Sequence, residues 1–209
     1  LALWGGEAAG IVQPLNPLLS DEKLVSLMNA GRAKVLIAWG ADEDSGFWSK
    51  AMRIRALVPS LTAVLRVAPV NEINVPELPE GVLDFTAERK RECNDSLVSG
   101  RIIAPADIAA YFHTGGTTGA PKLARHSHGA QVFTAWGCVQ MQGVRSTDVT
   151  INGYPLFHVA GVLPGSLTSL SAGVEVVIPT TSLFRNRDVI KNYWRLVERY
   201  QAPVLSAVP

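Results

Sequence analysis

Short apolar segments that alternate with helix-forming segments constrain the fold of this chain most strongly. We expect strands at residues 35–39, 61–67, 108–114, 123–126, 149–153 and 174–178, and a last strand that begins at Val204. Helical patterns separate these segments near residues 20–31, 45–57, 128–141, 161–171 and 190–197. Because parallel strands need a long crossover connection, which is usually a helix, the alternation predicts an α/β fold of stacked βαβ units with largely parallel sheets.

The same alternation suggests how the chain is organised. We expect a first α/β unit over residues 1–67, a connector over residues 68–107 and a second α/β unit over residues 108–209. Four prolines and a charged stretch at residues 88–92 distinguish the connector from its neighbours. The first residues lack an initiator methionine and have the pattern of a helix end, and the last ones follow a strand-like run. We therefore interpret the chain as a piece of a longer polypeptide.

Local signals predict several helix ends and faces. Ser20 is expected to cap a helix with an acidic first turn, and Gly31 to end it. Ser127 is expected to cap the helix over residues 128–141. A single buried face is predicted for the last helix from the spacing of Ile190, Tyr193, Trp194 and Val197. All five tryptophans are assigned to the core because of their large apolar surface.

Composition and charge argue against several classes of protein. Hydrophobic residues make up 47% of the chain and charged residues 18%, and the net charge of +1 gives no electrostatic reason to bind nucleic acid. The two cysteines, Cys93 and Cys138, form no Cys-x-x-Cys pair, so we expect a reducing, cytoplasmic location without disulfides. No apolar run approaches the ~20 residues of a transmembrane helix, and no secretory signal is visible.

The glycine- and threonine-rich loop of residues 114–122 carries the most chemical information. Its three glycines allow backbone N–H groups to approach an anion closely, and its three threonines supply hydroxyl donors. Lys122 adds a positive charge suited to phosphate oxygens. The loop is not a Walker A loop, because Pro121 replaces the required glycine and Leu123 the required serine or threonine. The glycine spacing also differs from the dinucleotide-binding fingerprint.

This loop resembles the signature Thr-Ser-Gly-Ser/Thr-Thr-Gly-x-Pro-Lys-Gly of the adenylate-forming superfamily. The matching residues are Thr114, Gly116, Thr117, Thr118, Gly119, Pro121 and Lys122. Two residues depart from the signature: Gly115 replaces its serine and Leu123 its last glycine. In these departures the loop resembles a subgroup of bacterial acyl-CoA synthetases. Residues 10–17, Gly-Ile-Val-Gln-Pro-Leu-Asn-Pro, resemble the family's early element that ends in Pro-Leu-Asn-Pro, and residues 154–161 resemble its Pro-Leu-Phe-His-x-x-Gly segment. The whole chain is therefore similar to part of the N-terminal domain of an AMP-forming acyl-CoA synthetase.

The resemblance implies a two-step ligase reaction. A carboxylate attacks the α-phosphate of ATP, which carries Mg²⁺, to give an acyl-adenylate and pyrophosphate; the thiol of CoA then displaces AMP. The implied nucleotide-binding residues are Thr114, Gly115, Gly116, Thr117, Thr118, Gly119 and Lys122. Lys122 is implied to be the catalytic group that stabilises phosphate charge, and Phe157 and His158 to contact the acyl substrate. The expected partners are thus small molecules, namely ATP, a carboxylic acid and CoA.

Other parts of the family's machinery have no counterpart in residues 1–209. These are the Tyr-Gly-x-Thr-Glu segment for magnesium and adenine, the Thr-Gly-Asp segment for ribose, and the C-terminal domain with its adenylation lysine. We therefore expect the isolated chain to be inactive and to need the C-terminal domain of its own protein. Three alternatives stay open: a relative with a different acyl acceptor, a non-catalytic phosphate-binding α/β module, and an inert adenylation-like scaffold that serves as an interaction surface. No metal site is predicted, because no neighbouring Cys, Asp or Glu complements His126 and His128.

Overall fold

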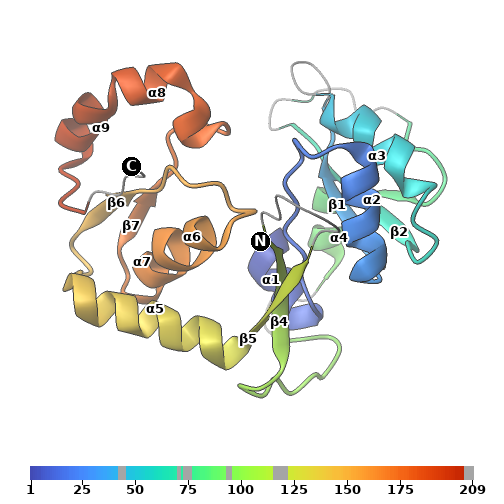
Figure 1. The fold of residues 1–209 in the computed structure, drawn as a ribbon, viewed down its shortest axis with the longest axis horizontal. Helices are drawn as coiled ribbons and strands as arrows, with labels where there is room; N and C mark the ends of the chain where they lie inside the picture. The colour runs from blue at the N-terminus through green and yellow to red at the C-terminus, as the bar shows by residue number, and fades with distance from the viewer. Residues whose placement is uncertain (42–45, 70–71, 73–76, 93–95, 115–121, 205–209) are drawn as a thin grey trace. The chain divides into compact units, whose positions relative to one another are not determined.

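The computed structural model describes residues 1–41, 46–69, 72, 77–92, 96–114 and 122–204. The chain forms two compact units, one of residues 1–103 and 109–124 and the other of residues 104–108 and 125–209. Figure 1 shows the helices and strands of both units. The division into units at residues 67 and 107 that the sequence suggested stays a prediction.

A parallel three-stranded sheet forms the centre of the first unit. Its strands are β1 (Val35–Trp39), β2 (Ala63–Val67) and β3 (Val82–Asp84), in the order β1-β2-β3. Val35 pairs with Ala63, and Val64 with Val82. The helices of this unit are α1 (Ala2–Ala9), α2 (Asp21–Ala30), α3 (Phe47–Arg55) and α4 (Phe85–Arg91). The predicted α/β class with parallel strands is therefore confirmed here.

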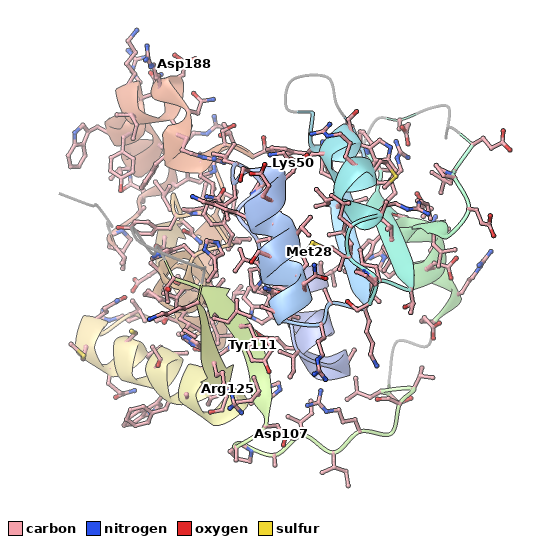
Figure 2. The ribbon with its side chains drawn as sticks, turned by 45° about the vertical axis from the view of Figure 1, so that its right-hand side comes forward. Met28, Lys50, Asp107, Tyr111, Arg125 and Asp188 are labelled. Atoms are coloured by element: carbon pink, nitrogen blue, oxygen red, sulfur yellow. The ribbon has the colours of Figure 1, made fainter. Side chains whose placement is uncertain are left out.

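Helix α2 provides much of the core of the first unit. Its N-cap is Ser20, whose hydroxyl accepts a hydrogen bond from the N–H of Lys23 at 3.4 Å, as the sequence predicted. Leu24 and Met28 of this helix are buried against Ile54 and Val58, at the end of α3 and just after it. Figure 2 labels Met28 on α2. Residues one helical turn apart on α2 thus make one apolar face, and burial of that face stabilises the unit.

A two-stranded sheet flanks the candidate phosphate loop. Strands β4 (Ile108–His113) and β5 (Leu123–Ser127) form a two-stranded sheet. Val12 joins β4 in a parallel bridge: its N–H donates to the carbonyl of Ala109 at 2.9 Å, and its carbonyl accepts from the N–H of Tyr111 at 2.8 Å. The side chains of Ala109, Ala110 and Phe112 are buried. Backbone hydrogen bonds and buried side chains therefore both anchor β4.

The second unit contains a short parallel sheet and several helices. Strands β6 (Val149–Ile151) and β7 (Glu175–Val177) pair in parallel, with Thr150 opposite Val176. The helices are α5 (His128–Gln142), α6 (Val159–Val162), the π-helix η1 (Leu163–Leu167), α7 (Thr168–Ser171), the 3-10 helix η2 (Leu183–Arg185), α8 (Arg187–Lys191) and α9 (Tyr193–Tyr200). The cap predicted for α5 is confirmed, because the Ser127 hydroxyl accepts from the N–H of Ala130 at 3.2 Å.

The buried face predicted for a single last helix is wrong. The chain there forms two helices, α8 and α9, and both Ile190 and Trp194 are more than half exposed. Asn192 lies between the helices, where its backbone leaves the helical conformation; its side-chain amide donates to the carbonyl of Asp188 at 2.9 Å.

The assignment of every tryptophan to the core is also wrong. Trp39, Trp136 and Trp194 are exposed by 42%, 58% and 70%. Two of them lie beside another aromatic ring on the surface: Trp136 is 6.1 Å from Phe133 and Trp194 is 5.7 Å from Tyr193, centroid to centroid. Apolar atoms form a large share of any folded protein's surface, so an apolar side chain alone does not determine burial. Among the described helices, none is both long and apolar enough to span a lipid bilayer.

Candidate functional site

The base of the candidate phosphate loop is closed by one backbone hydrogen bond. The N–H of Thr114, directly after β4, donates to the carbonyl of Lys122, directly before β5, at 2.9 Å. Both residues are exposed. The residues that carry the threonine hydroxyl and the lysine ammonium group therefore have neighbouring backbones at the end of the anchored strand β4. Such a pair can offer one hydroxyl donor and one positive charge to a phosphate group.

Five of the predicted nucleotide-binding residues lie between Thr114 and Lys122 in the sequence. Gly115, Gly116, Thr117, Thr118 and Gly119 lie outside the described residues. Their assignment to the phosphates of ATP is therefore still a prediction from the sequence.

The predicted acyl-binding residues lie in a turn that connects β6 to α6. His158 is exposed and caps α6, since its Nδ1 accepts a hydrogen bond from the N–H of Ala160 at 3.1 Å. A neutral imidazole that accepts at Nδ1 carries its proton at Nε2. His158 can therefore donate from Nε2. Phe157 is half-buried and Leu156 is 40% exposed, so the turn also presents apolar surface.

Sequence reasoning missed a buried polar network beneath this turn. Asn152, directly after β6, is 2% exposed and hydrogen-bonds to Tyr154, Gly161 and Ser166. The only sequence signal for it is an asparagine at the end of an apolar strand, and its partners are up to 14 residues away. The network determines the path of the turn that carries Phe157 and His158.

A buried arginine in the first unit was also missed. Arg66, near the end of β2, is 2% exposed, and its Nη1 donates to the Glu72 carboxylate at 2.8 Å. Two of its nitrogens, Nε and Nη2, donate to the carbonyl of Gly40, at 3.1 and 2.8 Å. The hydrogen bond from Arg66 lowers the pKa of Glu72 below its ordinary value, and the same hydrogen bond raises the pKa of Arg66. This cluster ties the segment after β2 to the carboxyl end of the parallel sheet.

Comparison with known proteins identifies the family. The family described as AMP-binding enzyme matches residues 6–209. The chain therefore belongs to the AMP-binding enzymes, the adenylate-forming class that its loop signature predicted.

Individual relatives agree with this assignment. Marinolic acid–CoA ligase of a Pseudoalteromonas strain is 29% identical over 213 residues, which cover 99% of this chain and 31% of that enzyme. Long-chain fatty acid transport protein 3 of Homo sapiens is 37% identical over 103 residues, which cover 48% of this chain and 15% of that protein. The crystal structure of anthranilate CoA ligase AuaEII with anthranoyl-AMP has the same fold, with a TM-score of 0.69 and 23% identity over 92% of this chain and 34% of that one. The chain thus spans about a third or less of the length of these proteins.

Proposed function

We propose that the protein to which this chain belongs activates a carboxylic acid with ATP and transfers the acyl group to CoA. The observation that carries the proposal is the hydrogen bond of 2.9 Å between Thr114 and Lys122. It closes a loop with the adenylate-forming signature at the end of a buried strand, in a chain of the AMP-binding enzyme family. Family membership alone would leave the role of the loop open.

In the proposed first step, the acid's carboxylate oxygen attacks the α-phosphorus of ATP, and the bond from that phosphorus to the bridging oxygen of pyrophosphate breaks. Negative charge grows on the departing pyrophosphate. The Lys122 ammonium group and the Thr114 hydroxyl would stabilise that charge, because fixed donors stabilise charge that develops during a reaction. Mg²⁺ enters as the partner of the ATP substrate. The thiol of CoA then attacks the acyl carbon, and AMP leaves.

In the same proposal, the turn after β6 binds the acid. Phe157 and Leu156 would contact the hydrocarbon part, and the Nε2–H of His158 would donate to a polar oxygen of the acid or its adenylate. Fatty acids are the first substrates to test, because the transport protein that matches half of this chain is named for long-chain fatty acids and because the turn presents apolar surface. The cytoplasmic location expected from the sequence belongs to the same proposal.

The test is acid-dependent AMP formation by the complete protein, with a panel of fatty acids of increasing length and one aromatic acid. The proposal expects AMP and pyrophosphate to form with at least one acid, and mass spectrometry to detect its acyl-CoA. Acyl-adenylate formation without acyl-CoA would favour a relative with a different acceptor. If ATP binds but no acid in the panel gives pyrophosphate, the non-catalytic phosphate-binding module becomes the better account.

A further inference from the structure

Both the oxygen and the nitrogen of the Asn152 side-chain amide form hydrogen bonds in a buried network. Its Oδ1 accepts a hydrogen bond from the N–H of Tyr154 at 2.9 Å. Its Nδ2 donates to the carbonyl of Gly161 at 3.0 Å and to the hydroxyl of Ser166 at 2.8 Å. Ser166, which is also buried, donates to the same Gly161 carbonyl at 2.8 Å. This orientation of the amide is the correct one, because the flipped orientation would place Oδ1 against the carbonyl oxygen of Gly161, and two acceptors form no hydrogen bond.

This network fixes both ends of the turn that carries the predicted acyl contacts. Tyr154 is held at the start of the turn and Gly161 at its end. The turn is also tight, because a Cβ atom on Gly161 would lie 2.4 Å from the carbonyl oxygen of Pro155. Between these fixed ends, Leu156 and His158 are exposed. The buried side of the turn is therefore tied down by Asn152, and its outer side is free to meet a ligand.

The third partner of Asn152 lies on an irregular helix. Ser166 belongs to the π-helix η1, where the chain makes a wider turn than in an α-helix. Such turns occur often at functional sites. The same helix leads to a second buried hydroxyl, that of Thr168, which donates to the carbonyl of Leu163 at 3.1 Å. Ser166 and Thr168 are 4% and 0% exposed, so they differ mainly in whether they contact the Asn152 network.

We propose that Asn152 is a positioning residue for the acyl substrate and helps to set which acids are accepted. Asn152 is too deeply buried to meet a substrate, and it acts by holding the turn that carries Phe157 and His158. The inference rests on the proposed function, since it assumes that this turn meets the acid. A buried hydrogen-bond network that is complete makes a turn rigid, whereas a broken one leaves polar groups without partners and lets the turn move.

The test compares Ser166→Ala, Asn152→Ala and the matched control Thr168→Val in the complete protein, by acid-dependent ATP–pyrophosphate exchange. Ser166→Ala and Thr168→Val each remove one buried hydroxyl donor, but only the first touches Asn152. We expect the KM for the acid to rise about fivefold in Ser166→Ala and about twentyfold in Asn152→Ala, with the KM for ATP within about twofold of wild type. The ratio of kcat/KM between a short and a long acid should also change in both variants. Thr168→Val should change neither quantity.

Different outcomes separate this inference from the proposed function. Equal effects of Ser166→Ala and Thr168→Val, or a parallel rise of the KM values for acid and ATP, would reduce Asn152 to a stability residue and overturn the inference. Thermal melting of each variant shows whether Asn152→Ala is still folded, and Ser166→Ala retains the test if it is not. A wild-type protein that exchanges no pyrophosphate with any acid would overturn the proposed function itself.

Discussion

Replacing Arg66 with methionine should destabilise the first unit more than the loss of an exposed arginine would. Methionine retains much of the apolar stem but removes every N–H donor, so the Glu72 carboxylate and the Gly40 carbonyl lose their partners. A buried carbonyl group left without a donor costs about 1–3 kcal/mol. We expect a loss of about 2 kcal/mol, because the Gly40 carbonyl is buried whereas the Glu72 carboxylate keeps 17% of its exposure and can reach water.

Urea unfolding followed by tryptophan fluorescence measures this loss, since Trp48 lies 5.9 Å from the Arg66 guanidinium. With an m-value of about 2 kcal/mol per molar, the midpoint should fall by about 1 M. Arg53→Met is the matched control, because the Arg53–Asp21 pair is exposed by 58% and 35%. The control should change the free energy of unfolding by less than about 1 kcal/mol. Equal losses in the two variants would refute the claim that burial makes the Arg66 pair important.

Three further predictions follow from other parts of the chain. Gly161→Ala should destabilise the second unit by about 1–3 kcal/mol in urea unfolding, through the clash with Pro155, whereas Gly137→Ala, which meets open space in α5, should be neutral or stabilising. Folding lowers the pKa of Glu72, so the stabilisation from its carboxylate is complete above the ordinary pKa of about 4.3 and is lost as the pH falls through the lower folded pKa. The difference in free energy of unfolding between wild type and Arg66→Met should therefore be smallest at the lowest pH. The isolated 209-residue chain should catalyse no acid-dependent pyrophosphate exchange.

Signals that act over a few residues made much of the fold predictable. Ser20 and Ser127 are followed at once by the helices that they cap, and the strand at Val35–Trp39 has the expected bounds. Such features depend on neighbours in the chain, so one sequence is enough to see them. The loop signature around Thr114 and Lys122 similarly indicated the family.

Features that depend on distant partners could not be predicted. Asn152 has an ordinary position after a strand, and its role becomes visible only when Ser166, on another helix, is brought beside it. Arg66 interrupts an apolar strand, which signals something unusual but does not name Glu72 as its partner. In both cases the side-chain hydrogen bonds join residues that no pattern of apolar spacing relates to each other.

The most direct test of the account is the rate of acyl-adenylate formation in a single turnover of the complete protein, compared between wild type and Lys122→Ala. Lys90→Ala, which removes an exposed lysine from α4, is the control. If Lys122 stabilises the departing pyrophosphate, its loss should slow adenylation about 30- to 1000-fold, equivalent to about 2–4 kcal/mol, with the affinity for the acid within about twofold of wild type. Adenylation at the wild-type rate in Lys122→Ala would contradict the claim that the loop of residues 114–122 acts on the phosphates of ATP.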